Sequence, residues 1–245
     1  MSPGLLRALF ITDPLIIVAT VVLGLLNLFV SLFESNGRRQ VAIAQYWSRV
    51  LLFIAGVKLE IEGLEKIDPA GSYVFVSNHA SYMDTPVVLG HIPLQFRFLA
   101  KKSLFSIPFL GYHLQRAGHI PVQRENPRSA IKAMSEAAKA IKERGISILI
   151  FPEGGRSLTG LQPFKEGAAY IAIKAGVPVI PLALKGTLEV LPMGSLNVRP
   201  GRVLMRVGDP VPTSHLTLHD REQLNETLFQ RVSELLGEPS YTQTK

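Results

Sequence analysis

Residues 73–86 of the chain read YVFVSNHASYMDTP, an apolar run followed by a polar turn and a proline. The run Tyr73–Ser77 is apolar on both faces, as expected for a β-strand buried inside a covered sheet. Pro86 suits the first turn of an α-helix, where its missing N–H costs no hydrogen bond. The stretch therefore predicts a strand that opens, through a turn, into a helix starting at Asp84 and Thr85.

The same alternation of strands and helices continues along the chain. Short apolar runs predict further strands at Phe96–Ala100, Ile146–Phe151, Val179–Leu184 and Val203–Val207. Helical patterns between and after them cover Pro127–Arg144, Ala168–Ala175 and Asp220–Gly237, and Gly145 suits the C-cap of the first. The alternation predicts an α/β fold with a mostly parallel central sheet flanked by helices on both faces.

Composition narrows the class of protein. Of 245 residues, 47% are apolar and 18% are charged, which excludes a disordered chain and a collagen-like repeat. Cysteine is absent, so disulfides, a thiolate nucleophile, an iron–sulfur cluster and a cysteine-ligated zinc site are excluded. The net charge of +7 favours an anionic partner such as lipid headgroups, a phosphorylated substrate or nucleic acid.

The N-terminus carries the longest uncharged stretch, PLIIVATVVLGLLNLFVSLF at Pro14–Phe33. A helix of this length spans a bilayer core of about 30 Å. A signal peptide has a shorter apolar region and a small-residue cleavage site, and the following ESNGRRQ offers none. A buried core helix is the remaining alternative, and the stretch favours a membrane segment over it.

A second apolar stretch, Val41–Val57, contains one charge, Arg49, and the interfacial residues Tyr46 and Trp47. Two arrangements are compatible with it: a single span followed by an interfacial helix, or a helical hairpin that dips into one leaflet. Basic residues are more numerous after the first stretch than before it, so the positive-inside rule predicts that residues 58–245 face the cytoplasm.

These features divide the chain into three parts. We expect membrane-anchoring helices at 1–57, an α/β catalytic domain at 58–238 and a flexible tail at 239–245. The predicted location is the inner, cytoplasmic membrane.

The turn after the first strand contains a candidate general base. His79 lies in this turn and Asp84 at the helix entry, so the two side chains can form a hydrogen bond across it. A carboxylate that accepts from an imidazole fixes its tautomer and stabilises the imidazolium formed on proton transfer. A helix-capping Asp next to an unrelated His is the alternative interpretation.

A second motif follows the strand predicted at Ile146–Phe151. Residues 151–157 read FPEGGRS, and an Arg in a glycine-rich turn offers a fork of donors that suits a phosphate group. The stretch GHIPVQR at 118–124 supplies a second candidate, Arg124.

Several other chemistries lack their sequence signatures. The chain has no P-loop, no dinucleotide-binding G-x-G-x-x-G, no G-x-S-x-G nucleophile elbow and no H-E-x-x-H. His215 and His219 lie in a polar loop without a third ligand nearby, so no metal site is predicted. No nucleic-acid recognition motif accompanies the basic charge.

The four segments NHASYMD, GHIPVQR, FPEGGRS and VPVIPLAL occur in this order between residues 78 and 184. This set resembles the glycerolipid acyltransferase family, whose members carry N-H-x-x-x-x-D, G-x-x-F/I-x-x-R, F-P-E-G-T-R-S and V-P-V-I/V-P. The resemblance extends over about residues 55–210. Gly155 departs from the family pattern, which usually has Thr there, and this affects the expected choice of acceptor.

The resemblance implies roles for individual residues. It makes His79 the general base and Asp84 its orienting partner. It assigns substrate binding to a larger set: Asn78, Lys101, Arg124, Glu153, Gly154, Gly155 and Arg156. Within that set, Arg124 and Arg156 are expected on the acceptor phosphate and Lys101 near the thioester oxygen.

The function implied is transfer of a fatty acyl group from acyl-CoA or acyl carrier protein to the sn-2 hydroxyl of 1-acyl-sn-glycerol 3-phosphate, giving phosphatidate. The expected partners are the phospholipid bilayer, lysophosphatidate and the acyl donor, with no cofactor and no nucleic acid. Another acceptor, such as glycerol 3-phosphate, a lysophospholipid or a lyso-aminolipid, is an alternative. A non-catalytic lipid-binding membrane protein and a basic nucleic-acid-binding module are alternatives from other classes.

Overall fold

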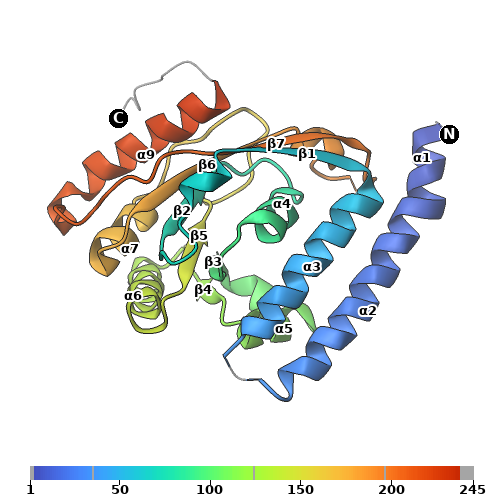
Figure 1. Cartoon of the computed structure of the whole chain (residues 1–245), viewed down its shortest axis with the longest axis horizontal. Coiled ribbons are helices and arrows are strands. Elements are labelled where there is room, and N and C mark those ends of the chain that lie inside the picture. Colours follow the sequence, from blue (N-terminus) through green and yellow to red (C-terminus); the bar gives the residue numbers. More distant parts are fainter. Residues whose placement is uncertain (1–2, 35, 124, 196, 238–245) are drawn as a thin grey trace.

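A central seven-stranded sheet organises the chain in a computed structural model that describes residues 3–34, 36–123, 125–195 and 197–237 (Figure 1). The strand order is β1-β7-β6-β2-β5-β3-β4. Strands β6, β2, β5, β3 and β4 are mutually parallel, whereas β7 is antiparallel to β6 and β1 is parallel to β7. The predicted α/β fold with a mostly parallel sheet is confirmed.

Five of the seven strands lie where the apolar runs predict them. These are β2 (Val74–Ser77), β3 (Phe96–Lys101), β5 (Ser147–Ile150), β6 (Val179–Lys185) and β7 (Gly201–Val207). The two strands at the edges of the sheet, β1 (Val57–Glu62) and β4 (Ile120–Val122), were not predicted. An edge strand with one exposed face does not form a continuous apolar run, as the alternation in VKLEIE illustrates.

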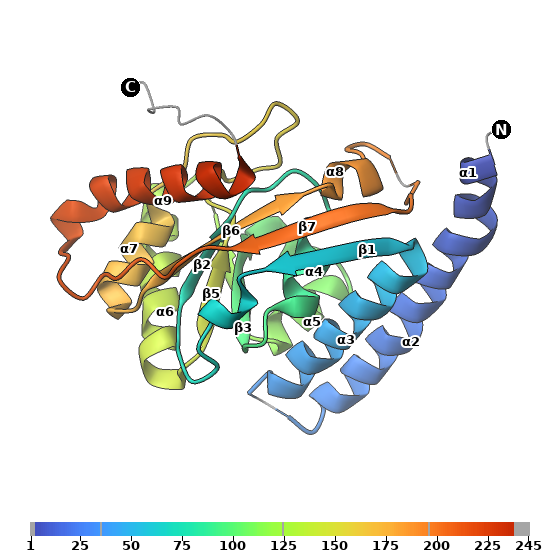
Figure 2. The ribbon, with the colours of Figure 1, turned by 45° about the horizontal axis from the view of Figure 1, so that its top comes forward.

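Helices cover both faces of the sheet (Figure 2). One face packs against α3 (Arg38–Ala55) and α4 (Asp84–His91), and the other packs against α6 (Pro127–Arg144), α7 (Gly167–Ala175) and α9 (Arg221–Leu236). Two shorter helices complete the fold, α5 (Leu110–Arg116) after the 3₁₀ segment Lys102–Ser106, and α8 (Thr187–Val190). The helices predicted at 127–144, 168–175 and 220–237 are confirmed to within one residue, and Gly145 is the C-cap residue in the left-handed region.

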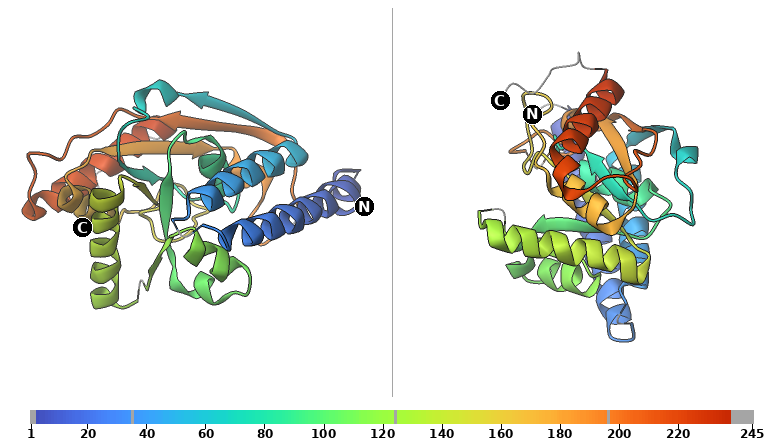
Figure 3. Two further views of the ribbon diagram at one scale, coloured as in Figure 1. Left: turned by 60° about the horizontal axis from the view of Figure 1, so that its bottom comes forward. Right: turned by 90° about the vertical axis from the view of Figure 1, so that its left-hand side faces the viewer.

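The N-terminal segments form a helical hairpin at one end of the sheet (Figure 3). A continuous helix begins at α1 (Pro3–Arg7), passes through a π-helical turn at Ala8–Thr12 and continues as α2 (Asp13–Ser31). Among the described residues, Gly4–Ser31 is the one helix long and apolar enough to cross a membrane. Its side chains are mostly exposed.

The second helix of this hairpin, α3, belongs to the main core. Val41, Leu51, Leu52 and Ala55 of α3 are buried in the same apolar cluster as the strands of the sheet. The Nε of Arg49 donates a hydrogen bond of 2.6 Å to the carbonyl of Gly90 in α4. Helix α3 therefore packs directly on the part of the chain after residue 57, while the division into an anchor at 1–57 and a catalytic domain at 58–238 stays a prediction. The predicted tail at 239–245 lies outside the described residues.

Candidate active site

The candidate catalytic residues meet at the carboxyl edge of the parallel strands, where α/β sheets usually place their sites. Strand β2 ends at Ser77 and leads into Asn78 and His79. Its neighbour β5 ends at Ile150 and leads into the FPEGGRS turn. Two motifs separated by about 70 residues in the sequence are therefore adjacent in space.

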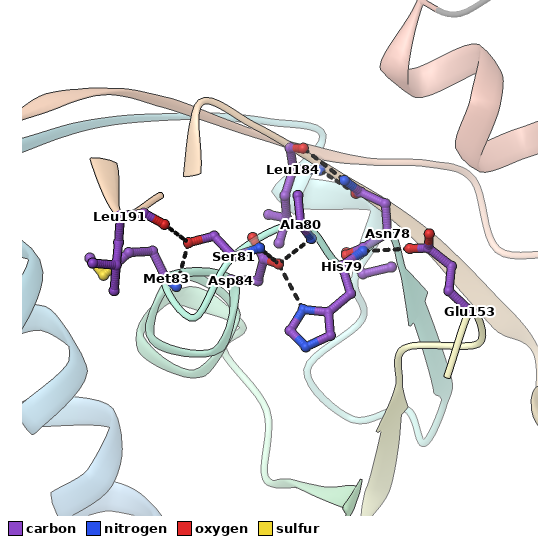
Figure 4. A network of polar contacts seen from close by, with 10 residues as sticks. Asn78, His79, Ala80, Ser81, Met83, Asp84, Glu153, Leu184 and Leu191 are labelled. Atoms are coloured by element: carbon purple, nitrogen blue, oxygen red, sulfur yellow. Dashed lines mark hydrogen bonds and ion pairs between the residues drawn. The ribbon is translucent and has the colours of Figure 1, made fainter. Parts of the chain in front are cut away.

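His79 and Asp84 form the hydrogen bond that their spacing predicts (Figure 4). The Nδ1 of His79 lies 2.7 Å from Oδ2 of Asp84. The same carboxylate oxygen accepts 2.8 Å hydrogen bonds from the backbone N–H groups of Ala80 and Ser81. The Asp84 side chain is completely buried and that of His79 is 17% exposed. An ionised Asp84 accepts from Nδ1–H, which leaves Nε2 as the basic nitrogen, and Nε2 points away from Asp84 (Figure 4).

Phe151 fixes the plane of the imidazole. Its ring stacks on the ring of His79 with the centroids 4.0 Å apart and the planes inclined by 15°. Phe98 stacks on Phe151 in turn, at 6.4 Å and 15°. His79 is therefore held at one edge by a carboxylate and on one face by an aromatic ring.

A second histidine nearby is not a rival base. The Nδ1 of His119 accepts a 2.9 Å hydrogen bond from the backbone N–H of Phe98. Burial, together with the positive charge of Arg97, lowers the pKa of His119 to about 3. His119 therefore stays neutral near pH 7 with its Nδ1 already engaged, and we assign it a structural role.

Hydrogen bonds connect the turn that contains His79 to the FPEGGRS turn. Oε1 of Glu153 accepts from the backbone N–H of His79 at 2.6 Å (Figure 4). Its Oε2 accepts from the backbone N–H of Gln162 at 2.9 Å. The backbone N–H of Ser157 donates 3.0 Å to the carbonyl of His79. Glu153 thus positions the turn that carries the base. Its predicted contact with substrate stays a prediction.

Two cations lie close to this pair of turns. The guanidinium carbon of Arg156 lies 3.4 Å from the centroid of the Tyr82 ring, so the planar group stacks on the aromatic face. The Nζ of Lys165 reaches the FPEGGRS turn, only 2.8 Å from where a Cβ on Gly154 would lie. Gly154 adopts φ +79°, and its missing side chain permits this approach.

The other predicted substrate-binding residues differ in their surroundings. The amide of Asn78 exchanges two hydrogen bonds, of 2.9 and 2.8 Å, with the backbone of Leu184 in β6, and so anchors the turn to the sheet. Lys101 is exposed at the end of β3, on the same edge as His79, where its backbone pairs with β4, and its side chain forms no ion pair or hydrogen bond within the described part of the chain. Gly155 is exposed. Arg124 lies outside the described residues, so its expected place on the phosphate is untested.

Two pockets lie next to the two motif turns. One, of about 340 Å³, is lined by His79 together with Glu153, Ser157 and Lys185. The other, of about 380 Å³, is lined mainly by apolar side chains of β3, β4, β5 and α6, and Phe151 forms part of its wall. Lys165 and the ion pair between Arg221 and Glu166 also line this second pocket. His79 therefore opens onto the first pocket, and Phe151, which stacks on His79, lies in the wall of the second.

The two glycines of the FPEGGRS turn are expected to respond differently to substitution. A Cβ at Gly155 would meet no heavy atom within 4 Å, and its φ is not positive, so Gly155→Thr should change the free energy of unfolding by less than about 0.5 kcal/mol. Gly154→Ala should cost about 1–2 kcal/mol, because an L-residue is strained at φ +79°. Urea unfolding of both variants measures the difference, and equal stabilities would contradict this description of the turn.

Sequence reasoning missed two neighbours of the base. Phe151 was recognised as part of a motif but not as the ring that stacks on His79, because the stack depends on strands β2 and β5 being adjacent. Lys165 lies 11 residues beyond Gly154 and carries no motif signal that the analysis used. The glycine pair at 154–155 was the available hint that another side chain approaches the backbone there.

Comparison with known proteins identifies the family to which this chain belongs. The family model described as Acyltransferase matches residues 58–185, slightly more than half of the chain and including His79, Asp84 and Arg156. The chain therefore belongs to the acyltransferase family.

Individual relatives are similar over most of this chain. The chain is 36% identical over 173 residues to the chloroplastic 1-acyl-sn-glycerol-3-phosphate acyltransferase BAT2 of Brassica napus, covering 69% of this chain and 49% of the relative. It is 30% identical over 189 residues to 1-acyl-sn-glycerol-3-phosphate acyltransferase alpha of Homo sapiens, covering 74% of this chain and 67% of the relative. The chain spans about half the length of the plant relatives it matches.

A solved structure extends the likeness to the whole chain. The 1-acyl-sn-glycerophosphate (LPA) acyltransferase of Thermotoga maritima superposes with a TM-score of 0.77 at 27% identity. The match covers 97% of this chain and 100% of that one, so it includes the N-terminal hairpin.

Proposed function

We propose that this protein is a membrane-associated 1-acyl-sn-glycerol-3-phosphate acyltransferase, which transfers a fatty acyl group from a thioester donor to the sn-2 hydroxyl and forms phosphatidate. The observation that carries the proposal is the His79–Asp84 pair lying next to a turn that presents Arg156. The names of the relatives in plants and humans support the same acceptor.

The geometry suits direct attack by the acceptor on the thioester. Nε2 of His79 takes the proton of the acceptor hydroxyl while the hydroxyl oxygen bonds to the thioester carbonyl carbon. Asp84 stabilises the imidazolium that forms. The tetrahedral intermediate then collapses, the carbon–sulfur bond breaks, and the leaving thiolate takes the proton from the imidazolium. The chain has no cysteine, and the acceptor hydroxyl itself serves as the nucleophile.

Positive charge near the base supports an acceptor that carries a phosphate. Arg156 and Lys165 both lie along the FPEGGRS turn, and Arg156 is oriented by its stack on Tyr82. A planar guanidinium binds two phosphate oxygens at once, which a lysine ammonium does not do in the same geometry. We propose that Arg156 binds the acceptor phosphate and fixes the hydroxyl relative to His79.

Replacing Arg156 by Lys tests this assignment. The substitution keeps the positive charge but removes the fork and the planar stack on Tyr82. We expect the KM for lysophosphatidate to rise about tenfold, corresponding to one lost charge-assisted hydrogen bond, with a much smaller change in the KM of the acyl donor. Steady-state kinetics with each substrate varied in turn gives both constants, and equal rises would contradict the assignment.

The apolar pocket behind Phe151 supports a fatty acyl substrate. Leu99, Val122, Ile131, Met134 and Ile150 line it, and such a wall suits an alkyl chain. We propose that acyl-CoA or acyl carrier protein supplies this chain as substrate, so that the reaction needs no resident cofactor.

A product analysis tests the whole proposal. Purified protein is incubated with acyl-CoA or acylated carrier protein and, separately, with lysophosphatidate, glycerol 3-phosphate, a neutral lysophospholipid and a lyso-aminolipid, and mass spectrometry identifies the products. We expect phosphatidate as the main product. If another acceptor is acylated instead, the protein is an acyltransferase of the same family with that acceptor as its substrate, and the open space at Gly155 is compatible with this outcome. The absence of any acylated product from an active preparation of folded protein would contradict it.

The hairpin packing favours one of the two membrane arrangements. The N-terminal helix contacts α3 along its length: Asn27 donates to the Gln40 carbonyl, Trp47 donates to Thr20, and Arg7 reaches Gly56. Since α3 is also packed on α4, a transmembrane α2 would bring α3 and part of the catalytic core into hydrocarbon. We therefore propose that the hairpin lies in one leaflet, on the cytoplasmic side that the basic residues predict.

The strength of this attachment can be measured by washing membranes. We expect the protein to stay in the membrane fraction in about 1 M salt, because burial of the apolar helix 4–31 is not weakened by ionic screening. Detergent should release it. Release of most of the protein by salt alone would mean that the attachment is electrostatic and would contradict the apolar anchor.

A further inference from the structure

We propose that the segment Lys102–Tyr112, comprising the 3₁₀ helix and the start of α5, is a second membrane contact that inserts Phe109 and its neighbours into the lipid beside the N-terminal hairpin. The contact is separate from the two apolar stretches of the hairpin. The contact rests on the membrane attachment of the hairpin proposed above, and its contribution to catalysis rests on the proposed acyltransferase activity.

The segment exposes a cluster of apolar side chains. Phe109 is 72% exposed, and the other members are also exposed to solvent: Leu104, Ile107, Leu110 and Tyr112. Large contiguous apolar patches on a protein surface usually mark an interaction site. Lys101 and Lys102 directly precede the cluster, and basic side chains next to an apolar one suit an anionic lipid surface.

The backbone holds Phe109 in an unfavourable conformation. Phe109 has φ +62° and ψ −56°, and the backbone N–H of Leu110 donates 2.7 Å to the carbonyl of Pro108, which defines a strained γ-turn. Within the described residues it is the one non-glycine residue with a positive φ. Gly111 allows the close return of the chain, since a Cβ there would overlap the carbonyl of Phe105. The fold therefore maintains a strained turn whose tip is an exposed aromatic ring.

The exposed cluster continues the apolar surface of the hairpin. The hydroxyl of Tyr112 lies 3.1 Å from Oγ of Ser31 in α2, and Arg116 of α5 donates to the carbonyl of the same serine. Figure 1 shows α5 beside the C-terminal end of α2. The side chains near this contact are themselves exposed and apolar: Leu25, Leu26 and Phe29 at the end of α2, and Leu32 and Phe33 directly after it. A bilayer that covers this end of α2 also meets α5 and the exposed apolar cluster that leads into it, so lipid rather than a soluble partner is the occupant.

The placement also suggests what the contact does. The segment begins directly after β3, whose carboxyl end lies on the same edge of the sheet as His79 and the FPEGGRS turn. Insertion of both Phe109 and α2 gives the protein two separate contacts with the membrane. Two contacts fix the tilt of the α/β domain relative to the membrane surface, which one contact alone does not. The acceptor, whose acyl tail stays in the leaflet, then meets the site in a constant orientation.

The natural absence of cysteine makes a direct test possible, because one introduced thiol can be labelled uniquely. The full-length variants Ile107→Cys and Phe109→Cys carry an environment-sensitive fluorophore. The control is Leu218→Cys, at an exposed apolar residue directly before α9, the helix that packs on the opposite face of the sheet from α3. The proteins are incorporated into vesicles of phosphatidylcholine and phosphatidylglycerol that contain quenchers on the acyl chains. Thermal unfolding confirms that each variant is folded.

We expect acyl-chain quenchers to quench the labels at 107 and 109 and to leave the fluorescence of the label at 218 unchanged. Aqueous iodide should quench the label at 218 and leave the labels at 107 and 109 unchanged. Quenching of the labels at 107 and 109 by iodide alone would overturn the proposal. Protection of these labels from both quenchers, together with a dimer in cross-linking, would also overturn it, because a second copy of the chain would then cover the apolar cluster. This readout is independent of activity. In addition, the Ile107→Ser/Phe109→Ser variant should raise the KM for acceptor in vesicles about tenfold and leave the KM for detergent-dispersed acceptor within about twofold of the unmodified protein.

Discussion

The His79→Ala variant should lose acyltransferase turnover by roughly 10²–10⁴-fold while it remains folded and bound to membranes. The substitution removes the basic nitrogen that takes the acceptor proton. His79 lies in a turn and not in the apolar core, so its removal leaves the packing of the sheet intact. Initial rates with saturating donor and acceptor measure the loss, and the circular dichroism spectrum and thermal midpoint show that the fold is retained.

His219→Ala is a suitable control for this experiment. His219 lies in the exposed segment before α9, away from the site, and its removal should leave the rate unchanged. The Kd of the acyl donor should also change little in the His79→Ala protein, because the base acts on the other substrate. A folded His79→Ala protein that retains near-normal turnover would disprove the proposed proton transfer.

The second large effect is expected from Asp84→Asn, which should lower turnover by roughly 10²–10⁴-fold and also lower stability. Oδ2 of Asp84 accepts three hydrogen bonds, and the side chain is fully buried. An asparagine oxygen can occupy the same place, but the negative charge that stabilises the imidazolium is lost. The amide NH₂ then occupies the place of Oδ1, which has no hydrogen-bond partner among the described residues.

An unsatisfied buried amide makes the stability effect measurable. We expect the free energy of unfolding of Asp84→Asn to fall by about 1–3 kcal/mol, the cost of a buried donor without an acceptor. His79→Ala should show a smaller loss, so the two variants separate catalysis from folding. If Asp84→Asn retains activity and loses only stability, the carboxylate positions the turn and does not assist the base.

Local patterns in the sequence were sufficient for much of the fold. Apolar runs predicted β2, β3, β5 and β6 because a parallel strand covered on both faces has no polar side to interrupt it. They also predicted β7, although it is antiparallel to β6 and only every second residue of it is buried. Helix α6 was predicted from Pro127 to Arg144 because proline at its start and glycine after its end are local signals. The edge strands β1 and β4 were missed because one is half exposed and the other has only three residues.

Some contacts of the candidate site were also predictable from the local sequence, and others were not. The hydrogen bond between His79 and Asp84 was predictable, since the two residues are five apart and a single turn joins them. The stack of Phe151 on His79, the hydrogen bond from His79 N–H to Glu153 and the approach of Lys165 to Gly154 were not. These contacts join separate segments, and they depend on which strands are neighbours in the sheet.

The sequence alone determined the chemistry that is available: a His–Asp pair in a strand-end turn, an arginine in a glycine-rich turn and an apolar N-terminal stretch without charge. It left two membrane arrangements open, because periodicity describes one helix at a time and not what that helix packs against. The tertiary structure shows α2 packed on α3 and α3 packed on the main core, and the proposed hairpin in one leaflet rests on that packing. It also exposed Phe109 beside α2, since only the folded chain brings residues 31 and 112 into contact.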